Sequence, residues 1–291
     1  MEKKHRKDRR DGYFLKKLDP YYAFTPFIMR TRNDASNYFK TEIEVTRASD
    51  YIRRLRAEGL GRLGFLHLFV AAYVRMLSQC PQLNRFTSGR RIYARRDIIF
   101  VMTVKKDMTA DAGETSIKVR FAPTDTIFEV YDKIEAEIQK VKSQAVVSKT
   151  DAAAKMLMKT PRFLLQGVVR VLEVMDYFGI LPQKLMEASP FHGSIIVTSM
   201  ASLGIPPIYH HLYNFGNLPV FVSFGAKRRA YELTRDGTAA ERNYMDFAVV
   251  TDERICDGFN YAKGFRYLKS YIREPESLSI RPDDIAVDLR I

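Results

Sequence analysis

The part of the chain richest in reactive side chains is Asp252–Gly258, which reads Asp-Glu-Arg-Ile-Cys-Asp-Gly. Its carboxylates could take a proton from a hydroxyl or a thiol, and Cys256 could act as a nucleophile. A free glutamate such as Glu253 has a pKa of about 4.3, so it is a poor base unless burial raises that pKa. Residues 188–226 contain no Asp, Glu, Lys or Arg and could supply such burial.

The uncharged stretch 188–226 holds hydroxyl and imidazole side chains of its own. Thr198 and Ser199 end a predicted strand, and strand alternation places them on opposite faces, so at most one can face a given site. His210 and His211 could supply an imidazole from a neighbouring segment or subunit, or they form a packed, hydrogen-bonded pair in a loop, which we favour. Two adjacent histidines without an acidic ligand make a weak metal site, and no metal is expected.

Hydrophobic periodicity predicts the elements that must position these residues. Strict alternation at 41–46 indicates a strand, and the apolar residues around 63–80 indicate a buried helix that ends before Pro81. Further strands are predicted at 96–104, 115–122, 193–200 and 218–225, helices at 47–59, 125–143 and 259–274, and a hairpin at 226–253 with Asp236-Gly237 near its turn.

A second apolar helix is predicted within residues 160–182, between Pro161 and Gly179. Three charged residues interrupt it, and basic residues precede it. One interpretation is a helix that lies on an anionic membrane surface in a weak contact. The other, which we favour, is a helix that covers the core or another subunit.

The composition of the 291 residues excludes several classes of protein. A content of 46% hydrophobic and 12% aromatic residues fits a globular chain and excludes a disordered or fibrous one. Two cysteines far apart in sequence exclude a disulfide scaffold and a four-cysteine zinc site. The charged N-terminus is followed by no apolar segment typical of a secretory signal, so we expect a cytoplasmic protein.

The net charge of +13 is partly concentrated at the N-terminus. Residues 1–17 carry eight Lys or Arg against three Asp or Glu, which predicts a basic N-terminal tail before a single domain at 18–291. We favour a solvated tail over residues 1–12. A basic chain suits nucleic acid, an anionic membrane surface or a phosphorylated substrate, but no nucleic-acid-binding motif is recognisable and no nucleic-acid partner is expected.

The block Asp252–Gly258 resembles an active-site motif of known acyltransferases. It is similar to the His-x-x-x-Asp-Gly motif of chloramphenicol acetyltransferase and of the dihydrolipoyl acyltransferase catalytic cores, where Asp-His-Arg-x-x-Asp-Gly is common. The order of the predicted elements from about residue 41 to 275, including Pro-Gln-Leu-Asn after the buried helix, also resembles that family. The resemblance implies an α/β fold, a chloramphenicol acetyltransferase-like two-layer sandwich in which a mixed sheet packs against helices.

Glu253 occupies the position of the family's catalytic histidine. That imidazole takes a proton from the acceptor, which then attacks the thioester carbonyl of acyl-coenzyme A, and its pKa of about 6.5 suits this task. Glu253 could be a base tuned by burial, a carboxylate that binds the acceptor, or the mark of a lost activity.

The resemblance also assigns roles to other residues. Asp257 would be structural and pair with an arginine, for which Arg30 or Arg32 is suggested; it could equally cap the last helix. Thr198, or alternatively Ser199, would hydrogen-bond the oxyanion. Residues near the phosphates of coenzyme A would be Lys227 and Arg228, although solvated hairpin charges are an equal alternative. Gly258 would allow a tight turn, and Cys256 would be small and buried rather than nucleophilic.

The resemblance thus implies a free-standing, coenzyme A-dependent acyltransferase-like protein that transfers an acyl group from acyl-coenzyme A to a small-molecule acceptor. No lipoyl domain is recognisable, so membership of a 2-oxoacid dehydrogenase complex is not expected. A homotrimer with active sites between subunits is implied, which the uncharged stretch suits. The alternative is a catalytically inactive relative that acts as a trimeric binding or scaffold protein.

Overall fold

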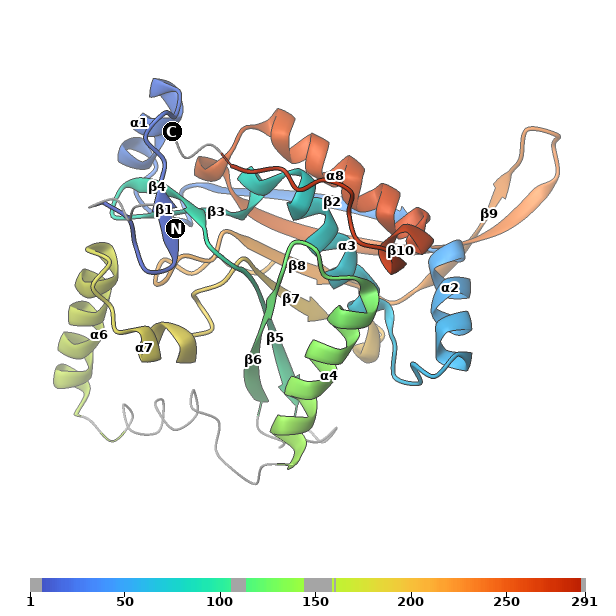
Figure 1. The fold of residues 1–291 in the computed structure, drawn as a ribbon, viewed down its shortest axis with the longest axis horizontal. Helices are drawn as coiled ribbons and strands as arrows, with labels where there is room; N and C mark the ends of the chain where they lie inside the picture. Colours follow the sequence, from blue (N-terminus) through green and yellow to red (C-terminus); the bar gives the residue numbers. More distant parts are fainter. Residues whose placement is uncertain (1–6, 106–113, 144–158, 160, 289–291) are drawn as a thin grey trace.

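The chain forms two β-sheets and a layer of helices. The computed structural model describes residues 7–105, 114–143, 159 and 161–288 (Figure 1). The larger sheet has the strand order β2-β10-β8-β7-β5-β6, and β9 pairs with the outer part of β10. The strands of this sheet are β2 (Ser36–Glu44), β5 (Ile98–Lys105), β6 (Glu114–Phe121), β7 (Ile195–Ser199), β8 (Val220–Phe224), β9 (Arg228–Leu233) and β10 (Ala239–Asp252).

The larger sheet is mixed, as the resemblance implied. Strand β7 runs parallel to both β5 and β8, whereas β10 is antiparallel to β2, β8 and β9. Parallel neighbours need long crossover connections, and the segment between β6 and β7 supplies one that includes a helix, α4 (Ile127–Ser143). The predicted strands are all present, and the first one, β2, begins earlier than the sequence pattern suggested.

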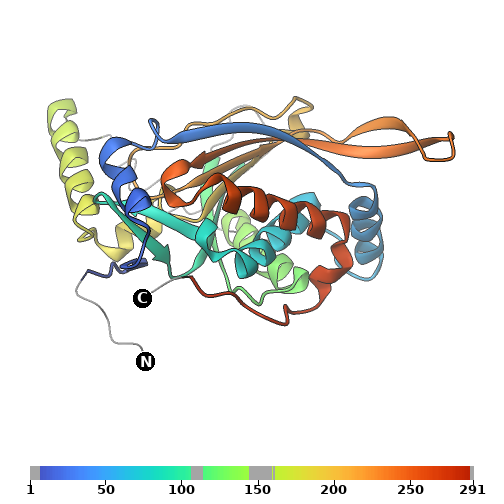
Figure 2. The same cartoon turned by 90° about the horizontal axis from the view of Figure 1, so that it is seen from above.

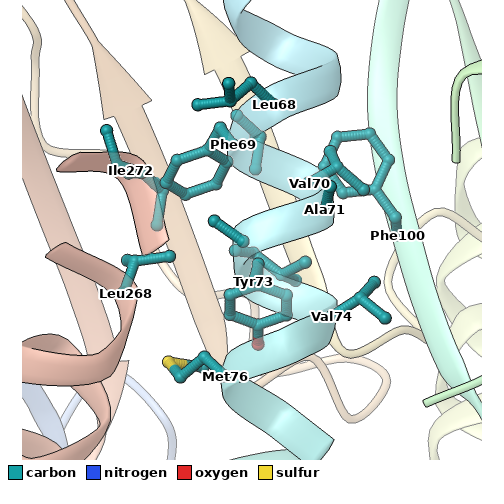
Figure 3. Packing of buried hydrophobic residues seen from close by; sticks show 14 of the residues in the cluster. Leu68, Phe69, Val70, Ala71, Tyr73, Val74, Met76, Phe100, Leu268 and Ile272 are labelled. Atoms are coloured by element: carbon teal, nitrogen blue, oxygen red, sulfur yellow. The ribbon is translucent and has the colours of Figure 1, made fainter. Parts of the chain in front are cut away.

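Four helices cover one face of this sheet, α2 (Thr46–Ala57), α3 (Phe65–Gln79), α4 and α8 (Gly258–Arg273), and Figure 2 shows them on one side of the strands. The predicted buried helix is α3, and every residue from His67 to Ser78 is buried. Its apolar side chains are contacted on several sides. Leu268 and Ile272 of α8 lie on one side of α3 and Phe100 of β5 on the other (Figure 3).

The opposite face of the sheet is covered by the uncharged stretch. Alternation along β7 places Ile195 and Val197 in the main core with the helices, and Ile196 in a second cluster on the other face. Leu212 and Leu218 complete this second cluster from the loop between β7 and β8. The ends of the stretch are therefore buried, as expected, while residues 202–206 in its middle are exposed.

Strands β9 and β10 form the predicted hairpin, and it extends beyond the body of the molecule (Figures 1 and 2). Gly237 adopts a φ of +81° in its turn, a conformation that glycine reaches without strain. Tyr231 and Leu233 are 73% and 81% exposed there. An exposed hairpin with large apolar side chains is typical of a surface that contacts another chain.

The described part of the N-terminal segment is not a solvated tail. Strand β1 (Gly12–Phe14) pairs with β4 (Arg91–Arg95), which pairs with β3 (Arg85–Ser88) in a small antiparallel sheet. Arg9 and Leu15 are buried. The structure differs here from the expectation for residues 1–12, of which 1–6 lie outside the described residues; the boundary at residue 17 stays a prediction.

The second apolar helix meets only part of our favoured interpretation, in which it covers the core or another subunit. Residues 162–177 form α6 (Arg162–Tyr177), followed by the short α7 (Gln183–Ala188), and α6 stands at the edge of the molecule (Figure 1). Among its residues only Asp176 is buried, whereas Phe163 is 74% exposed. The helix therefore does not cover the core of its own chain. None of the described helices is long and apolar enough to cross a membrane.

The close approach of α8 to the 3₁₀ turn after α3, Pro81–Asn84, predicts a specific effect of one methyl group. A Cβ on Gly264 would lie 2.1 Å from Cδ1 of the buried Leu83, so Gly264→Ala should destabilise the fold by about 1–3 kcal/mol through overpacking. Gly167→Ala on α6 is the matched control, because no atom lies within 4 Å of the added Cβ. That control should be neutral or slightly stabilising in urea unfolding. Equal effects of the two substitutions would contradict the packing described here.

Candidate active site

A buried ionic cluster lies where β10 ends. Asp252 is fully buried and accepts hydrogen bonds from Arg254 Nε at 2.8 Å and Arg254 Nη2 at 2.6 Å. Arg32 Nε lies 3.9 Å from the same carboxylate, and Arg254 Nη1 donates to the carbonyl of Met29 at 3.0 Å. Two buried arginines thus share one carboxylate, and they tie residues 29–32 to the end of β10.

This cluster corrects the expected partner of Asp257. Arg32 pairs with Asp252 and donates its other hydrogens to backbone carbonyls, among them those of Thr87 and Gly216. Asp257 caps α8 instead, accepting from the backbone N–H of Asn260 at 2.6 Å. Neither Arg30 nor Arg32 forms an ion pair with Asp257 among the described residues.

The expectations for Cys256 and Gly258, which lie between β10 and α8 and at the start of α8, have different outcomes. Cys256 is buried, as expected, and burial raises the pKa of its thiol far above the ordinary value, which disfavours the nucleophilic thiolate. Gly258 begins α8 without a positive φ, and no atom lies within 4 Å of a Cβ built on it. Neither the backbone conformation nor the space around Gly258 therefore requires a glycine there.

Glu253 lies on the surface of the single chain. It begins a short 3₁₀ turn, Glu253–Ile255, and its backbone N–H donates to the carbonyl of Ala35 at 2.8 Å. Its side chain is exposed, while its neighbours Asp252 and Arg254 are buried. The burial that could tune Glu253 as a base is thus not supplied by residues 188–226 of the same chain.

Thr198 and His210 do come together. Thr198 Oγ1 lies 3.0 Å from His210 Nε2, and the imidazole stacks on Phe221 of β8 with ring centroids 4.3 Å apart. Burial, with a smaller contribution from the charge of His211, lowers the pKa of His210 below 6.5, so its ring is neutral at pH 7. The favoured packed pair of His210 and His211 is therefore wrong for His211, which is exposed; His210 packs with Thr198 and Phe221 instead.

Strand alternation separates the two hydroxyls, as expected. Thr198 lies on the face that carries Phe221, and Ser199 pairs with Phe224, whose side chain belongs to the main core on the helix-covered face. Of these two hydroxyls, only that of Thr198 contacts an imidazole among the side chains that the structure describes. Thr198 is therefore the better candidate for a hydroxyl that acts in a reaction.

Thr198 and Glu253 lie far apart within one chain. Thr198 pairs with Ser223 of β8, and Ser223 pairs with Ala248 of β10. Glu253 follows Ala248 by five residues along the chain, which corresponds to about 16 Å along the strand direction. A single molecule therefore cannot bring this carboxylate and this hydroxyl to the same reacting atom.

The basic residues after β8 are not free of partners. Arg228 forms ion pairs with Glu42 and, at 3.5 Å, with Asp246. Arg229 lies 3.5 Å from Glu241, and Lys227 is exposed. A phosphate group would have to compete with these carboxylates for Arg228, so Lys227 is the more available cation of the two that the sequence suggested.

A second buried ionic cluster fixes the C-terminal end of α6. Arg9 donates to the carboxylate of Asp176 at 2.8 Å and to its carbonyl at 2.6 Å, and His192 Nε2 lies 3.3 Å from that carboxylate. Burial by itself would raise the pKa of Asp176, but His192 and Arg9 outweigh it and lower that pKa to about 2. The end of α6 is thus held by an ion pair, and most of the rest of the helix is exposed.

Sequence patterns did not reveal either ionic cluster. Asp252 and Arg254 belong to the motif itself. Their Asp-x-Arg spacing at the end of a predicted buried strand was the one sequence signal that could have indicated this ion pair. Nothing in the sequence indicated Asp176 as the partner of Arg9, because 166 residues separate them. No group of three or more potential metal ligands is found among the residues that the structure describes.

The fold is similar to those of solved acyltransferases. A probable dihydrolipoamide acetyltransferase from Listeria monocytogenes 4b F2365 matches with a TM-score of 0.57 and 16% identity, over 89% of this chain and 95% of that one. The dihydrolipoamide acetyltransferase of Azotobacter vinelandii matches with a TM-score of 0.57 and 11% identity, over 91% and 93%. A chloramphenicol acetyltransferase matches with a TM-score of 0.54 and 14% identity, over 88% and 96%.

No protein-family model and no curated protein matches the sequence. The structural comparisons therefore establish the fold that the motif implied, an α/β fold of the chloramphenicol acetyltransferase type. At such low identities they do not assign the reaction, which has to be argued from the residues.

The different surroundings of Asp252 and Asp257 predict that the same substitution lowers the stability of the fold far more at Asp252 than at Asp257. Asp252→Asn should lower the free energy of unfolding by about 3–5 kcal/mol, because it leaves two buried arginines without a counter-charge. Asp257→Asn should cost less than about 1 kcal/mol, because asparagine caps a helix as well as aspartate does. Urea unfolding of both variants measures the difference, and a larger loss at Asp257 would show that this residue carries the structural ion pair after all.

Proposed function

We propose that the protein is a coenzyme A-dependent acyltransferase whose active site is assembled between subunits. The observation that carries the proposal is the placement of Glu253 and Thr198 in this fold. Both occupy positions that the acyltransferase resemblance assigns to the reaction, yet they lie at well-separated points of one sheet. Two copies of the chain, placed as in a cyclic homotrimer, could bring Glu253 of one copy to Thr198 of the next.

Glu253 would act as the general base in this scheme. Its carboxylate would accept the proton of a hydroxyl, amine or thiol acceptor, whose heteroatom forms a bond to the thioester carbonyl carbon. When the tetrahedral intermediate collapses, the carbon–sulfur bond breaks and the coenzyme A sulfur takes up a proton. A neighbouring subunit that covers Glu253 would exclude water from its carboxylate and make it a stronger base.

Thr198 would stabilise the negative oxygen of the intermediate. The hydroxyl can donate to that oxygen only if it does not spend its proton on His210. A neutral His210 that carries its proton on Nε2 donates to Thr198 Oγ1 across the 3.0 Å contact and leaves the hydroxyl proton free. His210 would thus be a positioning residue, and Lys227 would lie near the phosphates of coenzyme A.

Exposed apolar surfaces support assembly into a homotrimer. The β9–β10 hairpin presents Tyr231 and Leu233, and α6 presents Phe163 and several valines. Contiguous apolar surfaces of this kind are unusual on a monomer. Our preferred occupant of both is another subunit; contact of α6 with an anionic membrane surface is the alternative that the sequence suggested.

A catalytically inactive scaffold is the second candidate function. The exposed carboxylate of Glu253 favours it, because no side chain of the described chain desolvates this group and a solvated glutamate is a weak base. Coenzyme A binding and turnover distinguish the two candidates.

The acyltransferase proposal predicts that Glu253→Gln separates binding from turnover. Calorimetry should give a micromolar Kd for coenzyme A with both the wild type and the variant. Release of free thiol from acetyl- or octanoyl-coenzyme A should fall about 100-fold or more in the variant, because a positioned base typically contributes that much. Glu58→Gln, at the exposed end of α2, is the matched control and should behave as the wild type. Absence of both binding and turnover in the wild type would favour the scaffold.

A shared site also predicts complementation between inactive variants. Glu253→Gln and Thr198→Val chains, each inactive alone, should regain about a quarter of the wild-type activity when unfolded together and refolded in equal amounts. In such mixed trimers one interface in four pairs an intact Glu253 with an intact Thr198. If no activity returns although sedimentation shows that trimers have formed, Glu253 and Thr198 do not form one active site between two subunits.

A further inference from the structure

A cavity of about 340 Å³ lies between α1 (Pro20–Ile28), the turn joining β3 to β4, the end of α6 and the loop at 214–216. Its lining is unusually basic. Five arginines and two acidic residues contribute to it: Arg30, Arg32, Arg90, Arg170, Arg254, Glu173 and Asp176.

The inner wall of the cavity carries positive charge that its own carboxylates do not neutralise. Arg32 and Arg254 are 5% and 3% exposed and share the single carboxylate of Asp252. Arg32 Nε is buried and has no hydrogen-bond partner among the described residues. Burial is also the main reason that the pKa of Arg32 is lowered to about 10. A buried cation of this kind is stabilised when an anion approaches it.

The acidic residues of the lining are already engaged. Asp176 is held by Arg9 and His192, and Glu173 lies 3.1 Å from Arg170 on the same helix. Neither of them is therefore available to neutralise the remaining arginines.

The mouth of the cavity adds two exposed arginines, Arg30 and Arg90. Within the described ranges, no carboxylate pairs with either of them. Arg90 lies over the ring of Phe27, 5.8 Å from its centroid. Guanidinium groups that converge on one space without carboxylate partners suit the planar, two-oxygen face of a carboxylate or phosphate.

The backbone holds Arg90 in a fixed place. Arg90 has a φ of +57°, and it is the only residue other than glycine with a positive φ in the described part of the chain. A Cβ on the preceding Gly89 would lie 2.4 Å from the carbonyl oxygen of Tyr177, so this turn packs directly against the end of α6. The two-residue turn between β3 and β4 requires a positive φ at both Gly89 and Arg90, so the hairpin itself fixes where Arg90 stands.

Apolar side chains complete the lining. Pro26, Tyr177 and Phe215 face the same cavity as the arginines. Ligand sites commonly combine such apolar walls with a few charged groups that fix orientation.

We propose that this pocket binds a small molecule that carries a carboxylate or phosphate group on an apolar body. The anionic group would lie among Arg30, Arg90 and the buried Arg32–Arg254 pair, and the apolar body against Tyr177 and Phe215. Because Arg254 directly follows Glu253, the bound molecule would lie beside the candidate active site. The binding itself requires no acyl transfer, so the proposal can fail or succeed independently of the proposed reaction.

Calorimetry on the full chain with three matched eight-carbon probes tests this pocket. Octyl phosphate or octanoate should bind, and the stronger of the two identifies the anionic group. Octanol, which lacks the charge, and inorganic phosphate, which lacks the chain, should each bind at least about tenfold more weakly. Raising the salt concentration should weaken binding of the anion.

The double variant Arg30→Ala/Arg90→Asn should weaken binding of the better probe by at least about tenfold, because it removes two charged contacts. Asparagine tolerates the positive φ at position 90, and neither arginine belongs to a buried ion pair, so the melting temperature should stay unchanged. The control Arg53→Ala/Arg235→Ala removes two exposed arginines elsewhere and should bind as the wild type does.

Two results would overturn the proposal. The first is that neither anion binds, and the second is that the double variant binds as tightly as the wild type. If neither anion binds while the wild type, but not the double variant, sediments with vesicles of phosphatidylcholine and phosphatidylglycerol, these arginines belong to a surface that contacts an anionic membrane.

Discussion

The sharing of one buried carboxylate by two buried arginines is the constraint on which the site depends. Asp252 is the last residue of β10, and Arg254 and Arg32 reach it from the following turn and from the segment before β2. A carboxylate and two guanidinium groups are costly to bury, so their geometry must be fixed by further hydrogen bonds. Those bonds go to the backbone carbonyls of Met29, Thr87 and Gly216, which belong to three separate segments. The exposed position of Glu253 and the shape of the arginine-lined cavity both follow from this arrangement.

The sheet and the helices that cover it could be predicted from local patterns. Alternation in β2 and the mostly apolar sequence of α3 are strong signals, because the spacing of apolar residues along an element indicates which of its faces is buried. The motif at 252–258 added the fold type, and the structural comparisons confirm it. Thr198 could be separated from Ser199 by alternation alone, although its contact with His210 required the structure.

The pairings between distant segments could not be predicted. Arg32 was a candidate partner for Asp257, and it lies against Asp252 instead, because sequence carries no information on which of two nearby carboxylates an arginine reaches. That α6 does not cover the core of its own chain could not be predicted for a related reason, and its cover by another subunit stays a prediction. An apolar helix has the same periodicity whether its own core or another surface covers it, and only the exposed Phe163 and Val171 tell the two apart. The buried Arg9 was hidden within a run of charges that resembles a solvated tail.

The position of β10 between β2 and β8 has a consequence for how the chain is made. Strand β2 pairs along its whole length with residues 244–252, which leave the ribosome about two hundred residues later. Until then β2 has no neighbour in the larger sheet, and the apolar residues of α2 and α3 have no completed surface to pack against. Such long-range pairing is slow because loop closure must precede the contacts that stabilise it. During synthesis, the N-terminal third of this protein therefore has to remain soluble without its sheet, and a cell that makes it in quantity would rely on chaperones to prevent its aggregation.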